Sequence, residues 1–113
     1  MRALKVSNRP LCLFGHTHYP VIFELSEESF DSVGSASAPQ LQVQMKPGCK
    51  YLINPGSVGQ PRDGDPRAAY AIVDTKQRRV ELYRTKYAVG EAQNKVLKAG
   101  LPDVLAQRLA VGR

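Results

Sequence analysis

The sequence predicts an α/β fold of α+β character, mostly β-strands followed by two short C-terminal helices. Up to residue 87, apolar residues occur in short runs or alternate with polar ones, which is typical of strands. From residue 88 they recur at helical spacing. With 113 residues, enough for one hydrophobic core, the chain is expected to lie within a single domain, with a strand-rich body at 1–87 and a helical tail at 88–113.

The first half of the body contains two predicted strands and a long loop. Residues 11–14 form a continuous apolar run that ends at Gly15, which favours a strand buried on both faces. Residues 20–25 are β-branched and aromatic and predict the next strand. Residues 26–40 are rich in Ser, Ala, Gly and acidic side chains and are predicted to be a surface loop.

The second half of the body contains four more predicted strands. Residues 41–46 alternate apolar and polar, as expected of a strand with one solvated face, and Pro47-Gly48 then turns the chain. Residues 51–53 form a third apolar run. Residues 68–74 and 79–87 predict a hairpin.

Two helices are expected in the tail. Apolar residues between 89 and 97 recur at helical spacing, and Gly100 is placed to end that helix. Pro102 suits the first turn of a second helix, whose apolar stripe lies within residues 101–109.

The charge of the chain is concentrated in its last third. The formal net charge is +6, and residues 76–113 hold nine basic against three acidic side chains, which accounts for the whole excess. These basic residues have no stacking aromatics at a recognisable spacing, so a solvated polar face is favoured over a nucleic-acid footprint. A nucleic-acid partner is therefore not expected.

Other features point to an ordinary intracellular protein. No apolar run approaches the ~18 residues of a membrane span, and no secretory signal is recognisable, so we expect no membrane and a cytoplasmic location. Cys12 and Cys49 lack the spacing of a zinc or redox pair. They are predicted to be buried free thiols without a role.

The residues with the clearest chemistry are His16 and His18, which follow a predicted strand in Gly15-His16-Thr17-His18. In an extended segment they would point to the same side, with Cα atoms about 6.6 Å apart. Neutral imidazole is a common metal ligand, so the pair predicts the edge of a metal site. Gly15 is expected to let the chain leave the strand in a conformation that other residues avoid. Exposed or structural histidines are the alternative.

About 35 residues after this pair, an apolar strand opens into Asn54-Pro55-Gly56-Ser57. The combination of the two motifs, in this order and after these strands, resembles the calcineurin-like metallophosphoesterases, in particular the bacterial single-domain phosphodiesterases. The resemblance extends from residue 11 onward through the turn at 60–67, the strand at 70–74 and the helix break at 100–102. It implies half of a two-sheet sandwich and a hydrolase of phosphate monoesters or diesters.

The resemblance also implies the roles of individual residues. His16 and His18 would ligate neighbouring ions of a pair of divalent metals (Mn, Ni, Zn or Fe), which activate a water for attack on the phosphate ester. Asn54 and Ser57 would orient a ligand or a phosphate oxygen, with a plain turn stabilised by Gly56 as the alternative. Arg62 would bind phosphate, and Arg67 is a weaker candidate; charges decorating a hairpin are the alternative.

The chain departs from the family in what precedes residue 15. The remaining family ligands lie N-terminal to the His pair, and the first 15 residues contain no Asp or Glu. We therefore expect the C-terminal part of one domain, with no catalytic residue of its own and no activity alone. The fragment would supply mainly one sheet, leaving Phe14, Ile22 and Ile53 unpartnered, so that it binds a missing N-terminal half or itself. The competing function is a non-catalytic binding or assembly module that keeps the fold.

Overall fold

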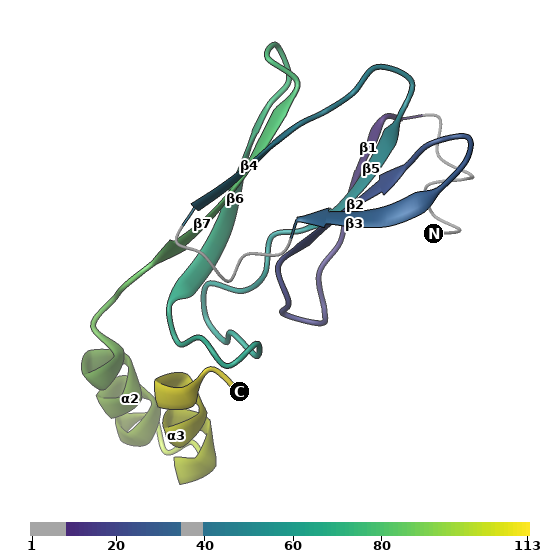
Figure 1. Ribbon diagram of the computed structural model, residues 1–113. Helices are drawn as coiled ribbons and strands as arrows, with labels where there is room; N and C mark the ends of the chain where they lie inside the picture. Colours follow the sequence, from purple (N-terminus) through teal and green to yellow (C-terminus); the bar gives the residue numbers. More distant parts are fainter. Residues whose placement is uncertain (1–8, 35–39) are drawn as a thin grey trace.

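The computed structural model of the chain describes residues 9–34 and 40–113. In these ranges two β-sheets are followed by a pair of helices, as the sequence predicts (Figure 1). One sheet has the strand order β1-β5-β2-β3 and the other β4-β7-β6. The strands are β1 (Leu11–Leu13), β2 (Val21–Leu25), β3 (Phe30–Gly34), β4 (Gln40–Gln44), β5 (Lys50–Asn54), β6 (Ala68–Asp74) and β7 (Arg79–Thr85).

Strand β5 is an inner strand of the first sheet and explains how the histidine motif and the Asn54-Pro55-Gly56-Ser57 motif meet. It pairs in parallel with β1 and antiparallel with β2, and four of its five residues are buried. Because β1 and β5 are parallel neighbours, the segments that follow them leave the sheet at the same end. The prediction that β1 is buried on both faces is wrong, since β1 is an edge strand and its Leu13 is 60% exposed.

The predicted loop at 26–40 contains a strand that the sequence does not reveal. Strand β3 pairs antiparallel with β2 after a turn closed by a hydrogen bond from Ser26 N to Ser29 O. The ring of Phe30 stacks on that of Phe23 with centroids 5.2 Å apart. A polar composition is compatible with an edge strand when a neighbouring strand supplies the hydrogen bonds, and here β2 supplies them across the turn. Residues 35–39 of the predicted loop lie outside the described ranges.

The second sheet was predicted closely. Strand β4 alternates exposed and half-buried residues, and β6 and β7 form the expected hairpin, although β7 ends at Thr85, two residues earlier than predicted. Its strand β7 packs against the first sheet through a shared core. The buried members of this core are Ile22, Met45, Tyr51, Ile53, Val80 and Leu82.

This shared core corrects one expectation. The chain supplies two sheets and not mainly one, and Ile22 and Ile53 are completely buried between them. Phe14 is half-buried. These side chains therefore have partners within the chain, and they give no reason for self-association.

Tyr51 carries a polar group into this core and makes the stability of the fold sensitive to pH. Its hydroxyl donates to Glu24 Oε2 at 2.7 Å and accepts from Lys46 N at 2.8 Å. Burial raises the pKa of Tyr51 from 10.0 to about 12, and the Glu24 carboxylate adds to the rise. Since the folded pKa exceeds the unfolded one, the contribution to stability is complete below pH 10 and is lost as the pH rises through 12.

We therefore expect the free energy of unfolding to fall between pH 9 and pH 12 by up to roughly 2 kcal/mol more in the natural chain than in Tyr51→Phe. The phenylalanine cannot ionise. Urea denaturation at a series of pH values measures the two slopes. Equal slopes would show that the phenol does not ionise with the assigned pKa.

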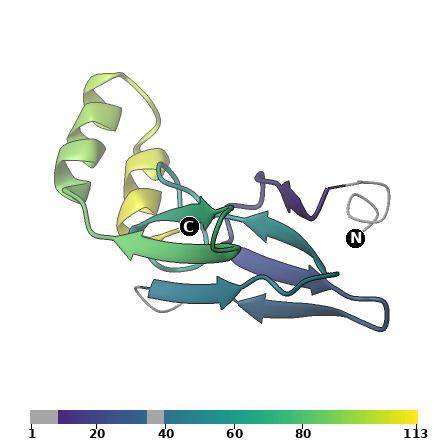
Figure 2. The same cartoon turned by 90° about the horizontal axis from the view of Figure 1, so that it is seen from above.

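The two helices, α2 (Val89–Lys98) and α3 (Asp103–Val111), pack against each other as an antiparallel pair beside the sheets (Figure 2). Gly100 ends α2 as predicted, with φ of 75° and hydrogen bonds from Gly100 N to Leu97 O and from Leu101 N to Val96 O. Pro102 lies at the N-cap of α3, one residue before the helical turn predicted for it.

The apolar stripe of the second helix is only partly buried. Leu109 is buried and Leu105 half-buried, but Leu101 and Val104 are about half exposed. Both cysteines are free thiols and only half-buried, so their predicted full burial is wrong. Within 9–34 and 40–113, no helix is long and apolar enough to span a bilayer.

Candidate metal centre

The two histidines lie in a strained loop between β1 and β2. His16 has φ of 76°, and Thr17 N donates to Gly15 O at 3.0 Å across it, the hydrogen-bond pattern of a classic γ-turn, which is rare. His18 has φ of 61°, again in the region that side chains avoid. Positive φ at non-glycine residues is costly and concentrates at functional sites.

This geometry corrects two expectations. The segment is not extended at the histidines, so the alternation argument for their relative direction does not apply. The unusual backbone falls on His16 and His18 themselves, whereas Gly15 does not have a positive φ and has open space around its α-carbon. The strain must therefore be held in place by contacts from other segments.

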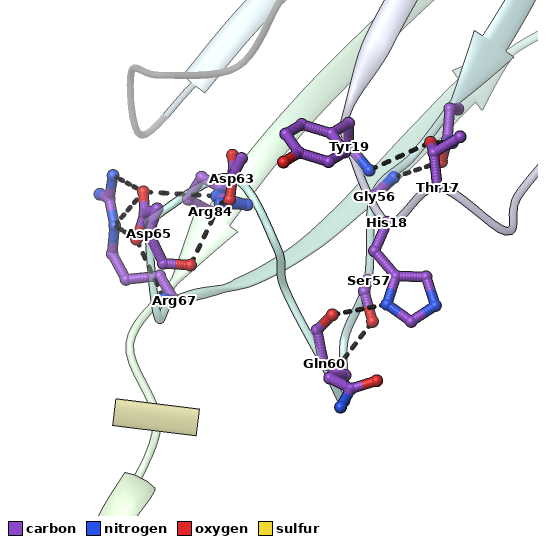
Figure 3. Close-up of polar contacts among 11 residues, drawn as sticks. Thr17, His18, Tyr19, Gly56, Ser57, Gln60, Asp63, Asp65, Arg67 and Arg84 are labelled. Atoms are coloured by element: carbon purple, nitrogen blue, oxygen red, sulfur yellow. Dashed lines mark hydrogen bonds and ion pairs between the residues drawn. The ribbon is translucent and has the colours of Figure 1, made fainter. Parts of the chain in front are cut away.

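His18 has the clearest orientation in the loop. Its Nδ1 lies 2.6 Å from Gln60 O, and because a carbonyl oxygen only accepts hydrogen bonds, Nδ1 carries the proton (Figure 3). In the neutral ring Nε2 is then unprotonated and has a lone pair to donate. A histidine whose second nitrogen is bound to a backbone carbonyl is the usual arrangement for a metal ligand. The ring of His18 is half-buried, while His16 is exposed.

Asn54 joins the two motifs. It is completely buried, its Nδ2 donates to Thr17 Oγ1 at 2.8 Å and, more weakly, to Gly15 O at 3.5 Å, and its Oδ1 accepts from Gly56 N at 2.9 Å. Both polar atoms are thus occupied within the protein. The geometry favours a role in holding the histidine loop over direct contact with a phosphate.

Ser57 and Gly56 shape the segment that carries Gln60. Ser57 Oγ accepts from Gln60 N at 2.8 Å, which closes a turn directly beside the carbonyl that binds His18. Gly56 has φ of 88°, and a Cβ there would lie 2.7 Å from the Cβ of Ala69. Only glycine fits at this position, as the sequence predicts.

A buried arginine anchors the loop beyond Gln60, and sequence reasoning missed it. The side chain of Arg84 is 0% exposed and forms ion pairs with Asp63 at 2.5 Å and Asp65 at 3.4 Å (Figure 3). Asp65 also binds Arg67, and these hydrogen bonds hold the pKa of the Asp65 carboxyl below its usual range. The only signal in the sequence is an arginine at an inward position of β7, where Val80 and Leu82 are also buried.

The two candidate phosphate-binding arginines differ in environment. Arg67 is engaged with Asp65, so its guanidinium is already neutralised by a carboxylate. Arg62 is exposed and donates to Gln60 Oε1 at 3.0 Å, which places it beside the residue that binds His18. Of the two, Arg62 keeps donors for a ligand.

The donor set fits a metal only in part. His18 has the protonation and support of a ligand, and His16 is accessible in the same loop. No group of three or more His, Cys, Asp or Glu that could hold an ion occurs in the described ranges. A two-metal centre therefore needs donors beyond these two imidazoles.

Comparisons with known proteins identify similar chains. No protein-family profile matches the chain. It is 42% identical over 103 residues to the uncharacterized protein MJ0912 of Methanocaldococcus jannaschii, a match that covers 91% of this chain and 40% of the relative. The crystal structure of a metallophosphoesterase from Sphaerobacter thermophilus matches with 38% identity and a TM-score of 0.80, over 95% of this chain and 44% of that protein. The chain thus has the fold of part of a metallophosphoesterase and spans less than half the length of either relative.

Proposed function

We propose that this chain supplies the histidine edge of a two-metal phosphoesterase, and that it corresponds to the C-terminal half of a calcineurin-like domain. The observation that carries the proposal is the ring of His18, fixed by Gln60 O with Nε2 free, on a fold shared with a metallophosphoesterase. His16, in the same strained loop, would be the second ligand. Their metals would be two divalent ions such as Mn, Ni, Zn or Fe.

In this proposal the metals, when bound, polarise the phosphate ester and lower the pKa of the attacking water. The residues of the chain hold and orient the metal ligands and the substrate. Gln60 O keeps the proton of His18 on Nδ1, and Asn54 donates to Gly15 O and Thr17 Oγ1, on either side of His16. Arg62, beside Gln60, would bind a phosphate oxygen. No residue of this chain is assigned as general acid or base.

The proposal includes a partner. Further metal ligands would come from a partner that corresponds to the part of the relatives this chain does not match, or from a second copy of this chain. The cytoplasmic location stays a prediction. The described ranges contain no group of three or more donors that could hold an ion. If no partner restores activity, the competing function, a binding or assembly module, is favoured.

A reconstitution experiment tests the function. The segment of the Sphaerobacter thermophilus metallophosphoesterase that this chain does not match would be co-expressed with the chain and assayed on a chromogenic phosphodiester with Mn²⁺. We expect hydrolysis that neither part shows alone and that EDTA removes. A stable complex without hydrolysis of phosphomonoesters or phosphodiesters, under any of the four metals, would favour the assembly module.

Metal binding by the isolated chain is a separate prediction. Because two imidazoles are too few for a dinuclear site, we expect calorimetry to detect at most one weakly bound Mn²⁺, Ni²⁺ or Zn²⁺ per chain. His18→Ala should remove that binding, whereas Arg62→Ala should leave it unchanged. Two tight ions per chain would contradict this assignment of ligands.

A further inference from the structure

A pocket of 610 Å³ lies between the loop that follows Gln60 and the exposed side of α3. Figure 1 shows this loop directly beside α3. The volume is in the range of small-molecule sites, roughly 300 to 1,000 Å³. The residues that line it are Arg62, Val104, Gln107, Arg108, Val111 and Arg113.

The lining of the pocket is basic and contains no acidic side chain. Three of its six residues are arginines. In the described part of the chain none of the three forms an ion pair, and the acids of the nearby loop, Asp63 and Asp65, are bound to Arg84 and Arg67. Guanidinium groups without a carboxylate partner are suited to bidentate binding of phosphate.

The helix contributes both charge and apolar surface to the same face. Val104, Arg108 and Val111 are spaced four and three residues apart along α3, so they lie on one side of it. The two valines are each about half exposed and present apolar surface beside the arginines. A ligand with a phosphate and an apolar or planar portion would satisfy both kinds of lining.

The loop that follows Gln60 is joined to the end of α3 by a backbone hydrogen bond. Gly64 N donates to Gly112 O at 2.9 Å. Gly112 has φ of 69°, and a Cβ there would lie 2.6 Å from backbone atoms of Asp65. The loop is also anchored by the ion pairs of Arg84, so the backbone that carries Arg62 is fixed beside α3 before any ligand binds. Such preorganisation lowers the entropy cost of binding.

We infer that this pocket binds a phosphorylated small molecule of about nucleotide size, with its phosphate on the arginines and its apolar portion on Val104 and Val111. The site shares Arg62 with the proposed phosphate contact at the metal centre, but it needs no metal and holds whether or not the chain takes part in hydrolysis. The three arginines line one open depression and are not spread along an extended surface, which favours a small ligand over a nucleic acid.

The experiment is an NMR titration of the ¹⁵N-labelled chain with ADP in the presence of EDTA. We expect saturable shifts at loop residues 61–66 and in α3, with a dissociation constant on the order of 1 mM or below. Arg108→Gln and Arg62→Gln should each weaken binding about tenfold or more, because each removes a hydrogen bond between charged groups. Pyrophosphate should bind more weakly than ADP, since it lacks the apolar portion.

Arg79→Gln is the matched control, because it removes the same charge from β7 where Arg79 is paired with Glu81. It should leave ADP binding unchanged. The inference is overturned by the absence of saturable shifts, by equal losses in Arg79→Gln and Arg108→Gln, or by pyrophosphate binding as tightly as ADP. Tighter binding of a 20-nucleotide single strand, weakened equally by all three variants, would instead indicate a nucleic-acid surface and would also overturn it.

Discussion

His18→Ala is expected to lower the metal-dependent phosphoesterase activity of the reconstituted protein by more than about 100-fold. Loss of a group that merely supports a ligand costs roughly 10- to 100-fold, and loss of the ligand itself should exceed this. His16→Ala should have an effect of the same order, because each imidazole would hold a different ion of the pair. The measurement is kcat/KM for the chromogenic phosphodiester at saturating Mn²⁺.

Arg62→Ala is the internal comparison for this result. An arginine that only positions phosphate should cost about 1.5 to 3 kcal/mol of transition-state stabilisation, while the ligands stay in place. The His18 variant should also need more Mn²⁺ for half-maximal activity, which the Arg62 variant should not. Full activity in both histidine variants would refute the proposed metal centre.

The second large effect is expected on stability, in Arg84→Met. The methionine keeps much of the volume of the side chain but leaves Asp63 and Asp65 without their buried partner. Removing one partner of a buried ion pair typically costs about 3 to 5 kcal/mol, and we expect a loss of this order in the free energy of unfolding. Denaturation by urea, followed by circular dichroism, measures it.

Two further variants make the Arg84 result interpretable. Arg79→Met, on the same strand, removes a partly exposed pair with Glu81 and should cost less than about 1 kcal/mol. If Arg84→Met alone does not fold, adding Asp63→Asn should restore folding, because the uncompensated charge is then gone, while Asp65 keeps Arg67 as its partner. A loss in Arg84→Met no larger than in Arg79→Met would show that this arginine does not anchor the loop.

The Arg84 variant also connects stability with the metal centre. The loop that Arg84 anchors begins near Gln60, whose carbonyl orients His18. In the natural chain we expect the Nδ1 proton of His18 to be protected from exchange and visible by NMR. In Arg84→Met, under conditions where the protein is folded, it should exchange faster, whereas in Arg79→Met it should not.

Much of the architecture could be read from local patterns. The runs at 11–14 and 51–53, the alternation at 41–45 and the hairpin at 68–87 all correspond to strands, because each pattern reflects which faces of an element are buried. Gly100 and Gly56 could be assigned because a positive φ is a local requirement that glycine meets most easily. The resemblance in the two motifs pointed to the same fold that the Sphaerobacter thermophilus structure shows.

Contacts between segments distant in the chain decided the rest. Strand β3 is defined by its pairing with β2 and not by its own composition. The ion pairs of Arg84 join it to acids 19 and 21 residues away, which no local period encodes. The same is true of the tautomer of His18, set by a carbonyl 42 residues further on, and of the positive φ at His16, held through buried Asn54. The histidines of a metal site can thus be recognised from the sequence. Their protonation and backbone strain arise only in the fold, because the parallel neighbours β1 and β5 bring the two loops to the same end of the sheet.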